Sequence, residues 1–342
     1  MSALAALRNR GVQAGLASAV LFGVAAPLAA LLLGSASPWM VAALLYLGSG
    51  LGLSVLRLVT RAPRPRLPRA DVPWLGGAIL AGGVLAPVLL MLGLTGMPAS
   101  SASLLLTAEG VFTAVLAWVA FGENVDRRVL LGFGAIVAGV VLLAWQGEVG
   151  AASLWPTAAV LGACLLWGVD NNLTRRVSLH DATWLAAVKG WVAGSVNLVL
   201  ALGVGGSLPA PAVVVLTGAL GLVSYGISLA LFVVALRGLG TARAGAYFSV
   251  APFVGALLAV LLGDPVTWQL VAAGLLIAAG VWLHLTERHD HAHVHVLVVH
   301  AHPIVPDEHH AGPPAAQTTE HTHSELRHDH PHYPDAHHRH EH

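Results

Sequence analysis

Long apolar segments separated by short polar ones follow one another along the first 286 residues. A helix rises about 1.5 Å per residue, so about 20 apolar residues cross the hydrocarbon core of a bilayer. Many of the segments are rich in Ala and Gly, which is typical of closely packed membrane helices. We expect the Gly190-x-x-x-Gly194 pair to contact another helix of the same chain. The pattern predicts an all-α membrane protein with ten spans, over residues 12–33, 39–59, 72–94, 99–120, 129–146, 153–172, 182–203, 211–235, 242–262 and 267–286.

The second half of this region repeats the first at a distance of 141 residues. Each half holds five predicted spans, and because five is odd the second half crosses the membrane in the opposite sense. Inverted repeats are typical of secondary transporters, which bind substrate near the midplane where the two repeats meet. We therefore predict two five-helix repeats, residues 1–146 and 147–286. The matching landmarks are Phe112 with Phe253, Gly122 with Gly263, Glu123 with Asp264, and Gly139 with Gly280.

The composition separates a membrane domain from a polar tail. The chain is 56% hydrophobic and 10% charged, with a mean hydropathy of +0.74, which excludes a soluble globular domain of this length. Residues 1–286 carry 14 Lys and Arg against 8 Asp and Glu, whereas residues 287–342 carry 3 against 9 and hold 17 of the 19 histidines. Such a composition cannot form a packed core. We predict a mostly disordered tail over residues 287–342, with weak order around Val294–Val299.

Positive charge orients the chain in the membrane. Arginines occur before the first span and after the second, fourth, sixth and eighth spans, whereas the alternate loops contain neither Lys nor Arg. By the positive-inside rule, both termini face the cytoplasm. The predicted location is a bacterial-type inner (plasma) membrane, which the chain crosses many times.

Residues 103–123 (SLLLTAEGVFTAVLAWVAFGE), followed by a Gly-rich span, resemble the EamA-type unit of the drug/metabolite transporter superfamily. The second copy is residues 251–264 (APFVGALLAVLLGD), and the resemblance covers residues 12–286. It implies a transporter of metabolites, amino acids, drugs or other solutes, in which the fourth and ninth spans line a central cavity. Gly110 stands where such units often have Pro, whereas the second copy keeps Pro252. If that Pro kinks the helix, the two halves bend differently.

Glu109 is the sharpest candidate for function, because ionisable groups inside spans are costly. It lies ten residues into the fourth span, about 15 Å down a helix and so close to the midplane. Thr113 lies one turn further on the same face, with Ser103 and Thr107 on an adjacent one. Glu109 either exchanges a proton or a cation during transport, or is a protonated acid that hydrogen-bonds a neighbouring helix. The equivalent stretch of the ninth span holds no acid, and its candidates are Tyr247, Ser249 and Pro252.

Asp170 and Lys189 form a second candidate pair. Asp170 lies near the end of the sixth span, and Lys189 lies about 10 Å inside the seventh. A short loop joins these spans, so the two charges are able to approach one another. Two interpretations remain open: a fixed ion pair that holds the helix hairpin, or a substrate or gating site. Asn171 extends either one.

The histidines of the tail are candidate ligands for divalent metals. Neutral imidazole suits Zn, Ni, Co and Cu(II). The tail would deliver metal to a transport route, buffer or sense cytosolic metal, or respond to pH without binding metal. Cys164 is the only cysteine, which excludes a thiolate cluster. The candidates are His289, His291, His293, His295, His300, His302, His328, His330, His332, His337, His338, His340 and His342.

No arrangement of residues predicts an enzyme, a required cofactor or a nucleic-acid interface. The expected partners are the lipid bilayer and a small-molecule substrate, with divalent metal ions and a second copy of the chain as open alternatives. We predict a secondary transporter that exports a small polar metabolite or drug-like solute by alternating access, with protons as a candidate coupling ion. One alternative is a divalent metal transporter. The other is a membrane-anchored protein that binds or senses metal through its tail.

Overall fold

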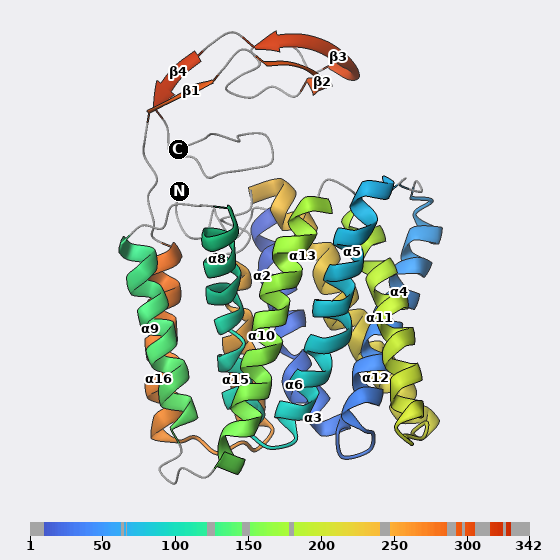
Figure 1. Ribbon diagram of the computed structural model, residues 1–342, viewed down its shortest axis with the longest axis vertical. Helices are drawn as coiled ribbons and strands as arrows, with labels where there is room; N and C mark the ends of the chain where they lie inside the picture. Colours follow the sequence, from blue (N-terminus) through green and yellow to red (C-terminus); the bar gives the residue numbers. More distant parts are fainter. Residues whose placement is uncertain are drawn as a thin grey trace. The chain divides into compact units, whose positions relative to one another are not determined.

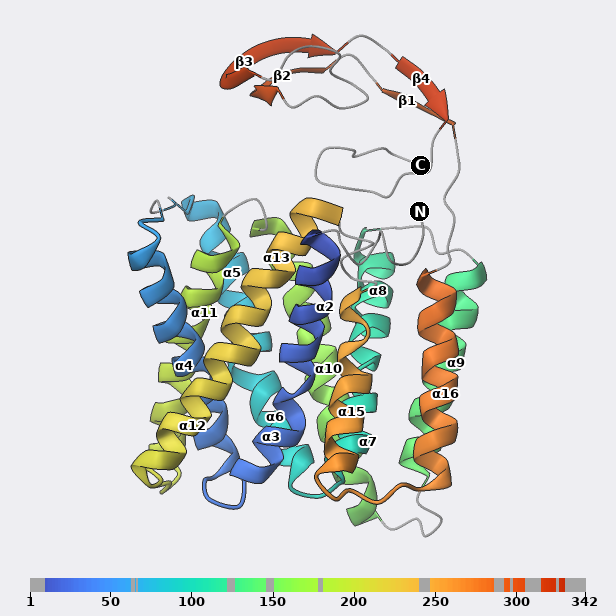
Figure 2. The same ribbon diagram turned by 180° about the vertical axis from the view of Figure 1, so that it is seen from behind.

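The computed structural model describes residues 10–62, 65, 67–121, 127–145, 151–177, 181–239 and 247–285, and in the tail residues 292–295, 298–304, 315–323 and 326–329. The chain forms two units, Met1–Thr286 and Glu287–His342, so the boundary falls where the composition changes. The first unit is a bundle of helices that run side by side (Figure 1, Figure 2). Its helices are α2 (Arg10–Gly23), α3 (Ala25–Leu32), α4 (Pro38–Val59), α5 (Val72–Ala78), α6 (Ala86–Leu94), α7 (Ala99–Leu105), α8 (Ala108–Phe121), α9 (Arg127–Ala144), α10 (Ala151–Val177), α11 (Ala182–Gly203), α12 (Pro211–Gly221), α13 (Ser228–Leu239), α15 (Ala251–Leu261) and α16 (Trp268–Leu285).

Within the described residues, six helical segments are long and apolar enough to cross a membrane. Their outward surface is apolar: Leu58, Val119 and Leu275 are each more than two thirds exposed in the isolated chain. Such a surface is stable only against lipid tails. The six segments are Arg10–Leu32, Pro38–Val59, Arg69–Leu94, Ala99–Leu116, Thr183–Gly203 and Pro211–Phe232, and the shorter apolar helices are Leu130–Ala144, Ala251–Leu261 and Trp268–Leu283.

Polar side chains cap the first turns of several of these helices. Ser37 caps α4 by accepting a hydrogen bond from the backbone N–H of Met40 at 3.3 Å, and Asp181 caps α11 through the N–H of Trp184 at 3.0 Å. Thr267 accepts a bond from the N–H of Leu270 in the first turn of α16. These side chains satisfy N–H groups that have no partner within the helix.

Two helices contain a π-helical segment, η2 (Ile79–Leu85) between α5 and α6, and η3 (Leu222–Ile227) between α12 and α13. In η2 the N–H of Ala86 bonds the carbonyl of Ala81, five residues back, and in η3 the N–H of Ser228 bonds the carbonyl of Val223. A π turn leaves one carbonyl without its usual helical donor, and such turns are frequent at functional sites. A short 3-10 helix, η1 (Arg69–Asp71), precedes α5.

The helix that contains Gly110 and the helix that contains Pro252 were expected to bend differently, but both are interrupted. Residues 106–107 form a turn between α7 and α8, and residues 249–250 form a turn before α15. The chain therefore breaks both helices with a two-residue turn, although only the second copy has a Pro next to it.

Glycines set the closest contacts between helices. A Cβ on Gly190 would lie 2.6 Å from the Cα of Gly50, and one on Gly194 would lie 2.7 Å from the backbone N of Leu47. The prediction that this G-x-x-x-G pair packs within one chain is confirmed, with α4 as its partner.

The helices α9 and α16 pack through a matching pair of glycines. Gly139 faces Ala273 and Ile277, whereas Gly280 faces Gly132 and Ile136. These are equivalent contacts of the two halves, because positions 139, 132 and 136 of the first half correspond to positions 280, 273 and 277 of the second, 141 residues later. The two helices thus meet through equivalent positions of the two halves.

The tail contains strands where the sequence predicted little order. β1 (Ala292–His295) pairs antiparallel with β4 (Leu326–Asp329), and β2 (Val298–Ile304) pairs antiparallel with β3 (Ala315–His323). Alternating His and β-branched or small residues have the period of a strand, which accounts for strands in so polar a segment. The weak order expected around Val294–Val299 falls within β1 and β2 and the two undescribed residues between them.

Candidate functional site

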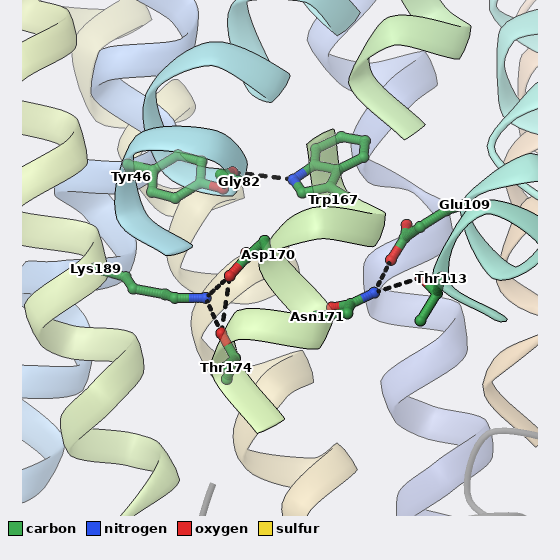
Figure 3. A network of polar contacts seen from close by, with 9 residues as sticks. All are labelled: Tyr46, Gly82, Glu109, Thr113, Trp167, Asp170, Asn171, Thr174 and Lys189. Carbon is green, nitrogen blue, oxygen red and sulfur yellow. Dashed lines mark hydrogen bonds and ion pairs between the residues drawn. The ribbon is translucent and has the colours of Figure 1, made fainter. Parts of the chain in front are cut away.

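Lys189 and Asp170 form an ion pair between α11 and α10 (Figure 3). Lys189 Nζ donates to Asp170 Oδ1 at 2.5 Å and to Thr174 Oγ1 at 3.0 Å. Thr174 Oγ1 in turn donates to the same carboxylate oxygen at 2.8 Å. The two charged side chains are only 18% and 12% exposed, so each charge depends on the other. The approach predicted from the short connecting loop is therefore present.

Glu109 is joined to the same helix by the next residue along the chain, Asn171. Asn171 Nδ2 donates to Glu109 Oε1 at 2.9 Å and to Thr113 Oγ1 at 3.2 Å (Figure 3). Asn172 donates to the backbone carbonyl of Thr113 at 3.0 Å. Glu109 and Thr113 thus share a face of α8, as their spacing predicts. In the isolated chain Glu109 is half-buried and Asn171 is exposed.

Because Asp170 and Asn171 are adjacent, α10 carries both halves of the network. Asp170 binds the cation of α11, and Asn171 binds the acid of α8. Figure 3 shows the two groups pointing to opposite sides of α10. A rotation or shift of this one helix would change both contacts together.

The π-helical segment η2 supplies the third part of the site. Its turn frees the carbonyl of Gly82, which accepts bonds from Tyr46 Oη at 2.7 Å and Trp167 Nε1 at 3.0 Å. Pro87 has no N–H, so the carbonyl of Gly83 also lacks a helical donor. Asn197 Nδ2 takes that place at 3.1 Å. Three helices, α4, α10 and α11, are therefore anchored to two adjacent carbonyls.

Gly82 also allows Asp170 to approach the backbone of η2. A Cβ on Gly82 would lie 2.0 Å from Asp170 Oδ2, which no side chain could tolerate without displacing the carboxylate. The position of Asp170 beside Lys189 thus depends on a glycine from a different helix. The sequence pattern did not predict this arrangement; the nearest signal is Pro87, which lacks an N–H and so marks a free carbonyl at Gly83, the residue after Gly82.

An aromatic group adjoins the acids. Tyr225 in η3 lies 5.4 Å from Tyr46 and 5.8 Å from Phe22, between ring centroids. Phe248 lies 5.2 Å from Phe22 and 4.9 Å from Phe232. These aromatic rings come from α2, α4, η3, α13 and the segment before α15, so both halves of the chain contribute to the site.

The other predicted residues of the membrane domain lie on α7, on α15 and in the segments next to them. Ser103 is 1% and Thr107 9% exposed, and neither hydroxyl has a hydrogen-bond partner in the described part of the chain. Tyr247 packs against Gly15 of α2. Ser249 lies in the turn before α15, and Pro252 lies in the first turn of that helix.

Of the predicted metal ligands, only five lie in described strands. These are His293, His295, His300, His302 and His328, whereas His289, His291, His330, His332, His337, His338, His340 and His342 lie outside the described residues. Where side chains are described, no group of three or more His, Cys, Asp or Glu is arranged to hold a metal ion.

A separate ion pair joins the ends of α4 and α11. Arg57 Nη1 lies 2.8 Å from Asp181 Oδ1 and donates to Thr183 Oγ1 at 2.7 Å. Partial burial acts to raise the pKa of Asp181, but hydrogen bonds from Arg57, Thr183 and the N–H of Trp184 outweigh it and lower that pKa to about 2. The pair fixes two helix ends on the side predicted to face the cytoplasm.

The sequence profile of the EamA-like transporter family matches this chain twice, over residues 9–145 and 154–286. The chain belongs to the EamA-like transporter family. It is thus an integral membrane protein that transports solutes, and family membership gives it no enzymatic role. The two matched segments together cover most of the membrane unit.

Two relatives of this EamA-like chain carry transport names. An "Uncharacterized transporter" of Methanothermobacter thermautotrophicus is 29% identical over 286 residues, covering 77% of this chain and 82% of the relative. A "Probable amino-acid metabolite efflux pump" of Salmonella typhimurium is 28% identical over 208 residues, covering 56% of this chain and 68% of the relative. A crystal structure titled "Crystal structure of protein" superposes with a TM-score of 0.63 at 21% identity, covering 82% of this chain and 99% of the other, and shows the shared fold.

Proposed function

We propose that the membrane unit works by alternating access, as two inverted repeats of five helices that rock around a central site. The two family matches and the equivalent contacts of Gly139 and Gly280 support this proposal. In Figure 1, α2 and α3 descend from the end of the bundle where α10 finishes, so the first helices of the two halves run in opposite directions. Rocking of inverted repeats exposes the central site to each side of the membrane in turn.

Glu109 is the group that exchanges a proton during the cycle, and Asp170 with Lys189 forms the neighbouring gate. The observation that carries this proposal is the continuous network from Glu109 through Asn171 and α10 to Lys189. A substrate that displaces Asn171 from Glu109 would also move Asp170, because the two residues are adjacent. Binding at the acid would thereby loosen the ion pair that joins α10 to α11.

The substrate is a small polar metabolite that leaves the cell through the inner membrane, with the termini in the cytoplasm. The name of the Salmonella relative makes amino acids and their derivatives the first compounds to test. A divalent cation has less support at this site, because the described residues hold no group of three or more His, Cys, Asp or Glu arranged around a metal ion.

Uptake into inside-out vesicles tests the function. Labelled amino acids and derived metabolites are offered with and without an imposed proton gradient. We expect at least one compound to accumulate, faster with the gradient, and Glu109→Gln to lose the gradient dependence. Asn172→Ala is the matched control, because it removes a neighbouring amide that binds only the backbone of α8 and α10. If Glu109→Gln keeps the full gradient effect, the proposed role of Glu109 fails.

The tail is a second candidate site, favoured by the register of its strands. His293 is paired with His328, and His300 is paired with His321. Because neutral imidazole is a ligand for Zn and Ni, we expect strands that pair His with His to favour binding of these metals. Calorimetry of the full chain with Zn²⁺ tests this: replacing His300 and His321 by Ala should lower affinity at least tenfold, more than replacing His337 and His338. Equal losses of affinity in the two variants would mean that metal binding depends on the number of histidines and not on their pairing.

A further inference from the structure

Three hydroxyls on α7 and the turn after it are buried without a hydrogen-bond partner among the described residues. They belong to Ser100, Ser103 and Thr107, which are 1%, 1% and 9% exposed. Their spacing of three and four residues places them on neighbouring positions along α7 and the turn after it. An unsatisfied buried hydroxyl costs about 1–3 kcal/mol, so three in a row call for a partner outside the chain. Water is the partner whose size and hydrogen bonding fit such a row.

The row ends near a carboxylate on each side. At the start of α7, Asp264 Oδ2 accepts a hydrogen bond from the backbone N–H of Ser100 at 2.8 Å. Asp264 belongs to the loop between α15 and α16, in the other half of the chain. At the far end, Thr107 lies two residues before Glu109. The row therefore runs from one end of the bundle to the acid of the candidate site.

The turn after α7 brings Glu109 toward the side of Ser103. Between Leu104 and Gly110, several N–H groups bond carbonyls three residues back rather than four. Each residue in such a turn rotates by about 120° instead of 100°. With about two α steps and four 3-10 steps from Ser103 to Glu109, the acid lies roughly 40° around the axis from Ser103 and about 11 Å further along it. Three or four water molecules spaced about 2.8 Å apart span that distance.

Glycine keeps the space beside the row narrow. A Cβ on Gly255 of α15 would lie 2.7 Å from Ser103 Oγ and 2.7 Å from the carbonyl of Gly23. The backbone of α15 therefore packs directly against Ser103, which confines the route to the other sides of α7. Four titratable groups act electrostatically on the Glu109 carboxyl from neighbouring elements: Asp170, Tyr225, Cys164 and Tyr46.

We propose that Ser100, Ser103 and Thr107 line a water-filled proton route between Glu109 and the end of the bundle that holds Asp264, the end predicted to face outward. A proton enters as hydronium beside Asp264 and passes along the waters. Each hydroxyl accepts one hydrogen bond and donates another, so no Ser or Thr gains charge. The proton ends on the Glu109 carboxylate, which becomes the neutral acid. This inference rests on the proposed proton exchange at Glu109 and adds the path by which the proton arrives.

Cysteine accessibility tests whether the route contains water. The native thiol is first removed by Cys164→Ala, and Ser103→Cys or Thr107→Cys is then treated in intact cells with 2-aminoethyl methanethiosulfonate, which reacts with thiolates that water reaches. The control is Leu104→Cys, on the same helix and 3% exposed among apolar residues. We expect both route positions to react at least tenfold faster than the control. Rates equal to that of Leu104→Cys would overturn the proposal.

The rate of Glu109 protonation tests whether the route carries protons. After a pH jump, infrared spectroscopy of the reconstituted full chain follows the carboxylic C=O band that Glu109→Gln removes. We expect Ser103→Ala combined with Thr107→Val to slow its appearance at least tenfold with the same end point. Ser224→Ala, an equally buried and unpartnered hydroxyl in η3, should leave the rate unchanged. An unchanged rate in the double variant refutes the route alone, whereas the lack of any Glu109 band refutes the proton role as well.

Discussion

The ion pair between Lys189 and Asp170 decides between a fixed structural clamp and a gate. We consider Lys189→Met, Asp170→Asn and the double variant. Because the side chains are 18% and 12% exposed, removal of one partner leaves the other charge largely buried. Breaking such a pair costs about 3–5 kcal/mol, and the residual exposure places the expected loss near about 3 kcal/mol. With about 2–4 °C per kcal/mol for a domain of this size, each single variant should melt about 6–12 °C lower.

The double variant carries no buried charge, so it should recover most of that loss, to within about 1 kcal/mol of the original chain. Thermal unfolding in detergent, followed by tryptophan fluorescence, measures all four proteins. The more exposed pair of Arg57 with Asp181, at 11% and 30%, is the comparison, and breaking it should cost about 1 kcal/mol. If the double variant recovers stability and transport, the pair is a clamp; recovered stability with lost transport identifies a gate. Single variants that melt within 2 °C of the parent, on the order of 1 kcal/mol, would refute the reasoning.

Two further predictions concern Gly82 and the ion pair of Arg57 with Asp181. Gly82→Ala should lower the melting temperature and weaken transport, because its Cβ would displace Asp170. Gly76→Ala, which has open space around its Cβ position, should be neutral or stabilise the protein by up to about 1 kcal/mol. Thermal melting of both variants checks this prediction, and equal melting temperatures would contradict it. Because the pKa of Asp181 falls from 3.8 to about 2 on folding, the stabilisation from its contact with Arg57 is fully present above about pH 4 and is lost as the pH falls through 2. The melting difference between the parent and Asp181→Asn should therefore shrink between pH 4 and pH 2, and a difference that grows there would refute the assignment.

Much of the fold follows from one-dimensional patterns. Apolar length predicted the helices, and the Gly190 and Gly194 pair predicted a close contact whose partner, Gly50, only the structure supplies. The spacing of Glu109 and Thr113 placed them on one face, which Asn171 now bridges. These features depend on neighbours within a helix or on helices joined by a short loop. Sequence periodicity contains that information directly.

The hub at Gly82 depends on contacts between distant segments and was not predictable in the same way. Tyr46 and Trp167 bond the backbone carbonyl of Gly82, and Asn197 bonds that of Gly83; a side-chain pattern marks neither carbonyl. The π turn that frees this carbonyl changes the hydrogen bonding of one residue without changing the apolar character of the span. In the tail, the pairing of the strands, which brings His residues opposite one another, likewise depends on register and not on composition.

The proposed role of Glu109 is to couple transport to protons and not merely to bind substrate. The direct test is to compare two modes of flux in vesicles containing Glu109→Gln, using the first compound that the parent protein accumulates. Exchange of labelled for unlabelled substrate needs binding and alternating access, whereas accumulation against a gradient also needs the proton. We expect the variant to retain exchange within about threefold, a difference below about 1 kcal/mol, and to lose accumulation driven by a proton gradient. Full gradient-driven accumulation by Glu109→Gln would contradict it.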